Sequence, residues 1–544
     1  MTVKSVGVHS DAAQRGYRDQ GRWPQYTVGE RVRHWAAQRP DAIAVVDGTD
    51  GRRVTYRQLA EDSARVAAWL VGRGVQPGDG ISVQLPNRYE TVVMDVAALS
   101  VGACLNPLLP NYRRNELEHF LRVSDARVFV TPSTYRRFDH AALAEQLCAD
   151  LGGSIAHLVV DHDGHEFGGI PFSEALAHEP LSTFPPAQPD RVSELIFTSG
   201  TESLPKAVMH TEETVNHSVE ATLAHLGLGD DDVVWMPSPV GHSTGFNFGV
   251  RLALVAGVTV VLQDIWQPAE AARLIEENRC TYTLAASTFL ADLLRAARED
   301  GRDVSSMRTF GCGGGPVAAE LVREAAAQGI HVLRIYGSTE GLIISWNQPD
   351  APQVKREETD GLPPRHTEVA VWDEEGHALP AGEVGELMVR GPNVCVGFFD
   401  DAERTAATFT PDGWLRSGDL GFVDDDGYVT VSGRKKETII RGGLNIAPRE
   451  IEDLLAGMPG VREVAVIGVL DIRLGEIVGV CVVPEPGESP TLADVVDYLA
   501  AKQLAKYKLP QYIHVLSELP RTPTGKIRKT ELASSINFER NQSA

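Results

Sequence analysis

Apolar residues recur with helical spacing in two segments of the first hundred residues. Over residues 56–70 they return every three or four positions, and Thr55 and Gln58 stand where a capping box needs them. A second helical pattern covers residues 89–99. Short apolar runs lie on either side of it, at residues 81–85 and 103–109. Strand, helix and strand with short connections are typical of parallel sheets.

The alternation of apolar runs and helical patterns continues along the chain. Further strands are predicted at residues 158–160, 195–197, 233–236, 258–262, 282–285 and 332–335. The pattern therefore predicts an α/β fold, in which a large N-terminal domain contains parallel-sheet αβ layers. The first 25 residues are polar and irregular, and we predict a loose arm there.

The pattern changes in the last third of the chain. Frequent turn signals between short β-rich runs over residues 368–428 predict a β subdomain of the large domain, at about 345–433. Beyond it, about a hundred residues have the size of a separate small α+β domain, in which Pro448 begins a helical pattern with one apolar face. We accordingly predict a large domain, a hinge and a small mobile domain over residues 1–433, 434–437 and 438–544.

Composition narrows the classes of function. A chain of 544 residues needs more than one hydrophobic core, and 43% hydrophobic residues can fill them. The formal net charge of −23 argues against nucleic-acid or anionic-membrane partners, because either would need a basic surface. The chain has no signal-peptide core and no run of about 18 apolar residues, so we expect a cytoplasmic protein. The six cysteines are widely spaced, which argues against a disulfide framework or a zinc site. We therefore expect buried free thiols at Cys104, Cys148, Cys280, Cys312, Cys395 and Cys481.

A polar loop follows the strand predicted at residues 195–197. It contains Thr198, Ser199, Gly200 and Thr201 and ends at Lys206. Hydroxyl groups, backbone N–H groups and a lysine can together surround a polyphosphate. The Walker spacing is absent, and a polar β-turn would use the same residue types, so this loop alone leaves both interpretations open.

Further motifs follow this loop in a fixed order. They are Gly313, Gly314, Gly315 and Pro316, then Tyr336, Gly337, Ser338, Thr339, Glu340 and Gly341, then Ser417, Gly418 and Asp419, then residues 433–452, and last residues 520–527 around Lys526. In this order the motifs resemble those of the adenylate-forming superfamily, which includes acyl-CoA synthetases, luciferases and peptide-synthetase adenylation domains. The resemblance covers roughly residues 29–531. It implies an AMP-forming acid–thiol ligase of the acyl-CoA synthetase branch, which uses ATP, Mg²⁺ and coenzyme A.

The resemblance also implies roles for individual residues. Lys526 would bridge the carboxylate and the α-phosphate, and Glu340 would bind magnesium. Asp419 would accept both ribose hydroxyls, with Arg434 beside it. The other implied nucleotide-binding residues are Thr339 and Gly337 at the α-phosphate with Ser338 between them, and Tyr336 with Gly313, Gly314, Gly315 and Pro316 at the adenine.

The acid-binding part of the site is implied by the same resemblance. His242 matches the gate beside the carboxylate, and its segment lacks the aspartate that amino-acid-activating relatives use, which favours a simple acid. An acyl pocket would be formed by His242, Phe246, Thr288, Gly314 and Gly341. Apart from the histidine, these residues are small, apolar or neutral, which suits an uncharged acyl body. The glycines suggest room for a ring or an alicyclic group, and the sequence around the polar loop is similar to cyclohexanecarboxylate-type CoA ligases.

Coenzyme A would enter from the small domain. Lys436 matches the family's hinge, and Gly442 with Gly443 matches the backbone that lines the pantetheine tunnel. The resemblance implies that the small domain presents two faces in the two half-reactions. Lys526 would then swing away before the thiol attacks.

The polar loop departs from the family pattern at three positions. Glu202 replaces a threonine, Ser203 a glycine and Ala207 a glycine. A carboxylate about 5 Å from a phosphate charge, at an effective dielectric constant of about 20, costs roughly 3 kcal/mol for each pair of charges. The first hypothesis is a full ligase; a second is an enzyme that uses preformed acyl-AMP and forms only the thioester.

Other classes remain as alternatives. The chain could be a stand-alone adenylating enzyme that loads a carrier protein, or a non-enzymatic nucleotide-binding protein, although the retained Lys526 and Asp419 argue against the latter. The expected partners are a small carboxylic acid and coenzyme A, without nucleic acid or membrane. The sequence does not determine the oligomeric state, and a homodimer is left open.

Overall fold

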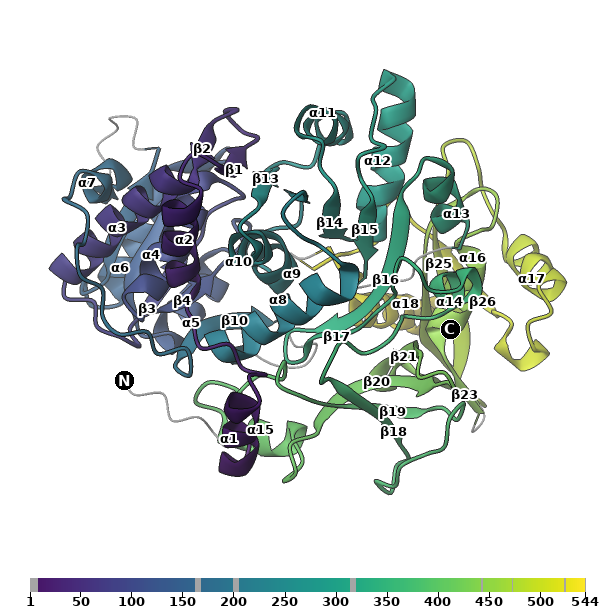
Figure 1. Ribbon diagram of the computed structural model, residues 1–544. Coiled ribbons are helices and arrows are strands. Elements are labelled where there is room, and N and C mark those ends of the chain that lie inside the picture. Colours follow the sequence, from purple (N-terminus) through teal and green to yellow (C-terminus); the bar gives the residue numbers. More distant parts are fainter. Residues whose placement is uncertain are drawn as a thin grey trace.

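Two mostly parallel sheets and their helices form the large N-terminal domain, and a smaller C-terminal domain lies beside it (Figure 1). The structure is a computed structural model that describes residues 8–161, 168–198, 205–313, 319–441, 444–471, 473–522 and 525–543. The α/β class predicted from the sequence is confirmed.

The strands of the two sheets follow the predicted alternation. The first sheet runs in the order β17 (Leu342–Trp346), β16 (His331–Ser338), β15 (Thr309–Cys312), β14 (Tyr282–Ala285), β12 (Val233–Met236), β13 (Thr259–Leu262), β1 (Ile43–Asp47) and β2 (Arg53–Thr55). The second sheet runs in the order β11 (Lys206–Thr211), β10 (Val192–Thr198), β4 (Cys104–Pro107), β3 (Gly80–Val83), β5 (Ala126–Pro132), β8 (Ala156–Val160) and β9 (Ile170–Pro171). The pairs β16–β17, β1–β2 and β10–β11 are antiparallel, and the other pairs in these sheets are parallel.

Helices cover both faces of the first sheet. One core joins strands of both sheets to α2 (Val28–Gln38), α3 (Tyr56–Gly72), α4 (Tyr89–Ser100), α8 (Glu212–Leu226) and α10 (Leu252–Ala256). A second core joins the opposite face to α11 (Pro268–Asn278), α12 (Ser287–Asp300) and α13 (Ala319–Ala327). Val45 belongs to the first core and Val46 to the second, as expected for a strand buried on both faces. The outer face of the second sheet packs on α5 (Arg114–Val123) and α6 (His140–Asp150).

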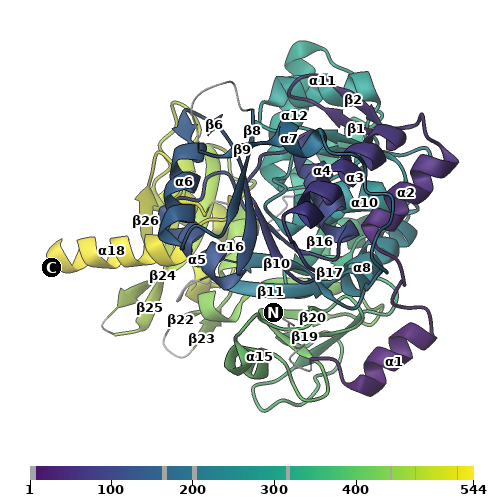
Figure 2. The ribbon, with the colours of Figure 1, turned by 90° about the vertical axis from the view of Figure 1, so that its left-hand side faces the viewer.

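Two further sheets complete the chain. The β-rich runs predicted near residues 368–428 form an antiparallel sheet of β18 (Glu368–Trp372), β19 (Gly385–Arg390), β20 (Leu415–Val423) and β21 (Val429–Arg434). The C-terminal sheet contains β22 (Ile439–Arg441), β23 (Leu444–Ile446), β24 (Val461–Asp471), β25 (Gly475–Pro484) and β26 (Tyr512–Val515). Its helices are α16 (Pro448–Leu455), α17 (Leu492–Ala501) and α18 (Lys529–Ser543). Figure 2 shows the C-terminal strands together at one flank, away from α2 and α3.

Local sequence signals predicted several elements closely. The capping box of α3 is present, because Gln58 N donates to Thr55 Oγ1 at 3.2 Å and Thr55 N donates to Gln58 Oε1 at 2.9 Å. The strand predicted at residues 282–285 is β14, and the helix predicted at 89–99 is α4. The six cysteines are buried and free, as predicted, and burial raises the pKa of Cys148 to about 11.

The prediction of a loose N-terminal arm is wrong for residues 8–25. The helix α1 (Asp11–Asp19) and its flanks dock on the large domain. Arg18 Nε lies 2.6 Å from Glu213 Oε1, and Trp23 Nε1 donates to the carbonyl of Pro392 at 2.9 Å. Trp23 is 2% exposed. These partners are distant in the sequence, so no local periodicity reveals the docking.

A buried ionic cluster links the two sheets behind the polar loop. Arg251 lies at the end of the π-helix η1 (Phe246–Arg251), 3.0 Å from Asp95 Oδ1 and 2.6 Å from Glu194 Oε2. All three side chains are 0% exposed, and Asn247 Nδ2 also donates to Glu194 at 3.0 Å. Because Glu194 is on β10 and Asp95 on α4, the cluster fixes β10 against the segment that follows His242.

Replacing Arg251 by leucine tests this cluster. The change leaves two buried carboxylates without their cation, and we expect the free energy of unfolding of the N-terminal domain to fall by about 3–5 kcal/mol in urea denaturation. The matched control is Arg295→Ala, which removes an exposed pair with Asp292 and should change the free energy by about 0.5 kcal/mol or less. Equal small effects of the two changes would contradict the stabilising role of the cluster.

Candidate active site

The predicted motifs gather at the carboxyl ends of the parallel strands. Thr198 ends β10, Gly313 follows β15, and Ser338 ends β16. Ligands of open α/β sheets bind at this edge. The predicted residues Ser199, Gly200, Thr201, Gly314, Gly315, Pro316, Gly442 and Gly443, together with Glu202 and Ser203, lie outside the described residues.

The carboxylate of Asp419 is the centre of one polar cluster. Tyr336 Oη donates to Asp419 Oδ2 at 2.8 Å, and Arg434 Nε lies 2.7 Å from Asp419 Oδ1. Asp419 and Arg434 are register partners on β20 and β21, whereas Tyr336 comes from β16 of the first sheet. Burial, together with the charge of Asp419, raises the pKa of Tyr336 well above its usual value, so the hydroxyl stays protonated and donates. The structure thus brings together the three residues that the resemblance assigned to the adenosine.

The residues from Gly337 to Gly341 form a tight turn between β16 and β17. A side chain at Gly337 would lie 2.4 Å from the carbonyl oxygen of Leu342, so only glycine fits. Leu342 has a φ of 52°, a left-handed conformation that costs a non-glycine residue about 1–3 kcal/mol. The Gly341 N–H donates to Ser338 Oγ at 3.0 Å, and the Cys395 N–H donates to the Glu340 carbonyl at 2.8 Å. A contact within the turn and one from the distant loop at Cys395 therefore fix the orientation of this turn.

Glu340 and Lys206 form an ion pair across the mouth of the site. Lys206 begins β11, directly after the polar loop, and both side chains are partly buried. Burial alone would raise the pKa of Glu340, but the charge and the hydrogen bond of Lys206 lower it below its usual value. The carboxylate is therefore ionised, and the loop lysine faces the residue that was assigned to magnesium.

Lys526 reaches the same site from the C-terminal domain. Burial by the surrounding protein and the charge of Arg434 lower the pKa of Lys526, and the carboxylates of Asp419 and Glu340 oppose the shift. The Lys526 side chain is nevertheless exposed to solvent. Three cations, Lys206, Arg434 and Lys526, thus surround two carboxylates, and the excess positive charge suits an anionic acyl phosphate.

His242 lies at the start of the acid-binding segment. It caps α9 (Ser243–Gly245), where the Thr244 N–H donates to His242 Nδ1 at 3.2 Å. Burial and then the nearby charge of Lys526 lower the pKa of His242 to about 4. The ring is therefore neutral near pH 7, which suits a side chain that packs beside a substrate carboxylate.

The remaining predicted acyl-pocket residues differ in exposure. Thr288 is exposed on the first turn of α12, whereas Phe246 is 1% exposed beneath Arg251, whose guanidinium carbon lies 4.3 Å from the ring centroid. A side chain at Gly341 would lie 2.9 Å from Ile344 Cδ1, and one at Gly313 would lie 2.5 Å from Ile335 Cγ1. At both positions a neighbouring isoleucine fills the space that a side chain would take. These glycines therefore do not by themselves create an empty pocket.

Two supporting side chains were not predicted from the sequence. His210 on β11 has its Nε2 2.7 Å from the carbonyl oxygen of Thr339, and Asn393 Nδ2 donates to the Gly341 carbonyl at 2.6 Å. Both hold the turn that carries Glu340. Their partners are more than fifty residues away, so the local sequence contains no signal of the contacts.

Lys436 lies between the two domains. It is exposed in the short 3₁₀ helix η2 (Lys435–Glu437). Lys435 Nζ lies 3.2 Å from Glu386 on the N-terminal side, and Glu437 lies 3.1 Å from Lys529 on the C-terminal side. Within the part of the chain that the structure describes, the predicted hinge is thus a short connection with an ion pair on each side, Lys435 with Glu386 and Glu437 with Lys529.

The donor set fits a cation that arrives with phosphates. In the described parts of the chain no group of three or more His, Cys, Asp or Glu side chains is placed to hold a metal. A single ionised carboxylate, Glu340, is available beside the turn, and Mg²⁺ in nucleotide sites is held by one or two carboxylates plus phosphate oxygens.

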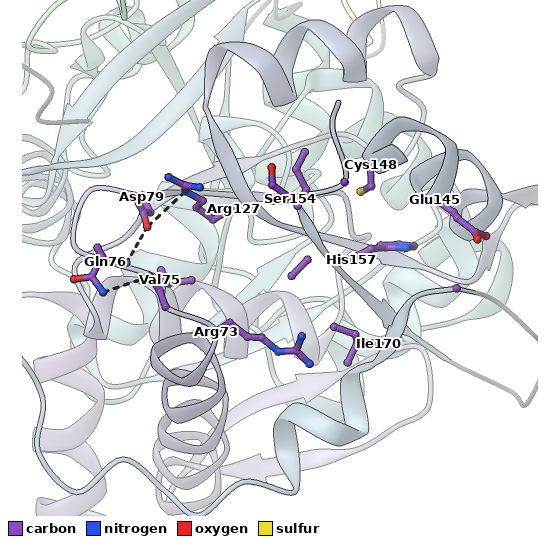
Figure 3. Close-up of a pocket in the computed structure, with 15 residues that line it drawn as sticks. Arg73, Val75, Gln76, Asp79, Arg127, Glu145, Cys148, Ser154, His157 and Ile170 are labelled. Atoms are coloured by element: carbon purple, nitrogen blue, oxygen red, sulfur yellow. Dashed lines mark hydrogen bonds and ion pairs between the residues drawn. The ribbon is translucent and has the colours of Figure 1, made fainter. Parts of the chain in front are cut away.

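A separate cavity of about 670 Å³ lies at the opposite end of the second sheet (Figure 3). Its lining includes Asp79 and Arg127, whose Oδ2 and Nε are 3.9 Å apart, and His157 near the start of β8. Burial lowers the pKa of His157 to about 4. The residues described around this cavity include none of the predicted site residues, so the candidate active site lies elsewhere.

No helix in the described segments combines the length and apolar character needed to cross a bilayer.

Comparison with known proteins identifies the family. A family model described as AMP-binding enzyme matches residues 32–399, and one described as AMP-binding enzyme C-terminal domain matches residues 450–526. The medium-chain fatty-acid–CoA ligase of Escherichia coli (strain K12) is 37% identical over 98% of this chain and 94% of its own length. A salicylyl-CoA synthase / salicylate adenylyltransferase from a Streptomyces species is 33% identical over 97% of this chain and 96% of its own.

A solved structure agrees with the sequence matches. The crystal structure of ATP-bound MatB from Rhodopseudomonas palustris matches 92% of this chain and 98% of its own with a TM-score of 0.82, at 29% identity. The chain belongs to the AMP-binding enzyme family, which confirms the resemblance found in its motifs. It is an AMP-forming acid–CoA ligase, with ATP and coenzyme A as its substrates beside the acid.

Replacing His242 by alanine tests its charge state. Because the pKa of His242 is about 4, its ring stays neutral from about pH 5 to about pH 9. Titration of His242 therefore does not change the reaction rate with pH in that range. We expect His242→Ala to lower the rate of acid-dependent ATP–pyrophosphate exchange without changing the shape of its pH profile. A limb near pH 6.5 that is present in the wild type and absent from the variant would contradict this.

Proposed function

We propose that this chain joins an apolar carboxylic acid to coenzyme A by two half-reactions at one site. The observation that supports it is the position of Lys526, which reaches from the C-terminal domain to Asp419, Glu340 and Arg434 of the nucleotide site. In the first half-reaction a carboxylate oxygen attacks the α-phosphorus of ATP, and the bond to the bridging oxygen breaks to release pyrophosphate. In the second, the thiol sulfur attacks the acyl carbonyl carbon, AMP leaves, and the thiol proton is released.

The charged residues have complementary tasks in the first half-reaction. Lys526 neutralises the charge that develops between the carboxylate and the α-phosphate, and Asp419 with Arg434 holds the ribose. Lys206 contacts the outer phosphates once it leaves Glu340, which becomes free to hold Mg²⁺. Mg²⁺ held by Glu340 would supply positive charge for the pyrophosphate that leaves. Binding of ATP with its metal would thus replace the Lys206–Glu340 pair by two contacts between opposite charges, Lys206 with phosphate and Glu340 with Mg²⁺.

The second half-reaction needs a different arrangement. Lys526 lies near Asp419 and Glu340 in the arrangement described, and the proposal requires it to move before the thiol attacks the acyl-AMP. A rotation about residues 434–437 around Lys436 would withdraw Lys526 and bring Gly442 and Gly443 to the site as a backbone tunnel for pantetheine. The short, exposed connection at η2 supports this proposal.

The acid is proposed to be uncharged beyond its carboxylate. A neutral His242, an apolar side chain at Phe246 and no side chain at Gly341 favour an apolar acyl body, linear or alicyclic. The named substrates of the two relatives, a medium-chain fatty acid and salicylate, are apolar or aromatic acids, which supports this class.

Replacing Lys526 by alanine separates the two half-reactions. We expect acid-dependent ATP–pyrophosphate exchange, measured with medium-chain, alicyclic and aromatic acids, to fall about 100-fold or more, because a preorganised charge at the reacting phosphate is lost. Thioester formation from supplied acyl-AMP should stay within about threefold of the wild type. The control is Lys502→Ala, an exposed lysine after α17.

The wild type decides between the proposals in the same assays. Robust exchange excludes an enzyme that only forms thioesters, whereas thioester made solely from supplied acyl-AMP supports that alternative. Acylation of a carrier protein's phosphopantetheine in preference to coenzyme A would support the carrier-loading alternative.

The altered polar loop can be restored to the family pattern. We expect the double change Glu202→Thr with Ser203→Gly to lower the KM for ATP by about tenfold, because a carboxylate beside the outer phosphates repels them. The KM is measured by pyrophosphate exchange at fixed ionic strength, with Glu299→Thr in the exposed C-terminal half of α12 as the control. An unchanged KM would show that Glu202 does not act on the phosphates.

A further inference from the structure

A buried carboxylate joins the two domains at a distance from the reacting groups. Asp360 is 2% exposed and belongs to the N-terminal domain. Its Oδ1 lies 3.1 Å from Arg334 Nη2 and 3.2 Å from Arg449 Nη2, and its Oδ2 accepts the Val431 N–H at 2.8 Å. Arg449 belongs to α16 of the C-terminal domain, so one carboxylate is shared between an arginine of each domain.

The N-terminal partners of Asp360 belong to the strands that carry the nucleotide residues. Arg334 is on β16, two residues before Tyr336, and Val431 is on β21, three residues before Arg434. Asp360 therefore has a fixed position relative to the adenosine cluster.

The C-terminal partner is connected to Lys526 through one helix. Arg449 and Glu452 are three residues apart on α16 and so lie on the same face of the helix. Glu452 Oε1 accepts the Val466 N–H at 2.7 Å and lies 2.8 Å from Lys529 Nζ. Lys529 is three residues beyond Lys526, so α16 carries both the contact to Asp360 and the contact that holds the lysine loop.

We propose that Arg449 is a positioning residue, which docks the C-terminal domain on Asp360 so that Lys526 reaches the nucleotide site. This assignment rests on the proposed function in one respect, namely that adenylation is the half-reaction that needs Lys526. The Arg449–Asp360 ion pair would hold the docked state, and it is separate from the reacting groups and from the hinge.

Arg449 can be replaced without removing the contacts that hold Asp360 within the N-terminal domain. Without Arg449, Asp360 still pairs with Arg334 and still accepts the Val431 N–H. The other carboxylate beside Arg449, that of Asp453 at 3.8 Å, has a side chain that is 39% exposed, so water can solvate its charge. Without Asp360, in contrast, Arg334 and Arg449 would both lose the carboxylate that they share. Arg449 is therefore the position at which docking can be weakened while the N-terminal domain keeps its own contacts.

The test compares Arg449→Met with a matched change on the same helix. Methionine keeps an unbranched chain and removes the charge, and Arg449→Lys keeps the charge as a conservative variant. The control is Glu450→Gln, whose partner Lys508 Nζ, at 2.6 Å, lies within the C-terminal domain. The readouts are pyrophosphate exchange, thioester formation from supplied acyl-AMP, thermal unfolding, and the rate of tryptic cleavage after Lys435 and Lys436.

We expect Arg449→Met to lower the kcat of exchange about tenfold, as the loss of a charge-assisted contact allows, with the KM for ATP within about twofold. Thioester formation and thermal unfolding should stay near the wild-type values. Tryptic cleavage at the hinge should be several times faster, because a domain that is no longer docked leaves the connection freer to adopt the extended conformation that a protease needs. Arg449→Lys should recover part of the exchange rate, and Glu450→Gln should change none of the four readouts.

The outcomes distinguish a failure of the docking role of Arg449 from a failure of the proposed adenylation activity. Equal loss of both half-reactions with a lowered melting temperature would show a structural role, and unchanged exchange with unchanged cleavage would show no role in docking; either overturns the assignment. If the wild type itself shows no exchange, the adenylation premise fails, and the cleavage rate alone decides whether Arg449 docks the domain.

Discussion

The site depends on a buried carboxylate that is shared between two sheets of the large domain. Asp419 on the antiparallel sheet binds Tyr336 of the first parallel sheet and Arg434 at the edge of the hinge. Burial raises the pKa of Asp419, and Arg434 with the Tyr336 hydroxyl opposes that shift. An isolated charge in this position would be costly, so the three groups stabilise the ionised form together and hold the two sheets in one arrangement.

The same principle recurs at two other junctions. Arg251 balances Asp95 and Glu194 behind the polar loop, and Arg334 with Arg449 balances Asp360 between the domains. In each case the acid and the base come from different elements, so the pair forms only when those elements meet in one geometry. Buried ion pairs contribute little net stability, and here they specify which surfaces meet. These two clusters do not touch the reacting groups, and they fix the positions of the elements that carry the site.

Much of the fold could be predicted from local signals. The capping box at Thr55 predicted where α3 begins, and the run at residues 282–285 predicted β14, because hydrogen-bonding side chains and apolar periodicity act over a few residues. The N-terminal arm was mispredicted for the same reason. Its helix is stabilised by Glu213 and by the carbonyl of Pro392, which no window of neighbouring residues contains.

For the site, the sequence determined the class of chemistry and predicted the reacting groups, and the tertiary structure determined how those groups are arranged. The order of the motifs around Thr198, Tyr336, Asp419 and Lys526 was sufficient to identify the chemistry, because each motif is a short segment with its own side chains. The pairing of Lys206 with Glu340, the neutral state of His242 and the support of Thr339 by His210 came only from the structure. Charge state and orientation depend on distance and burial, and both arise when segments hundreds of residues apart pack against one another.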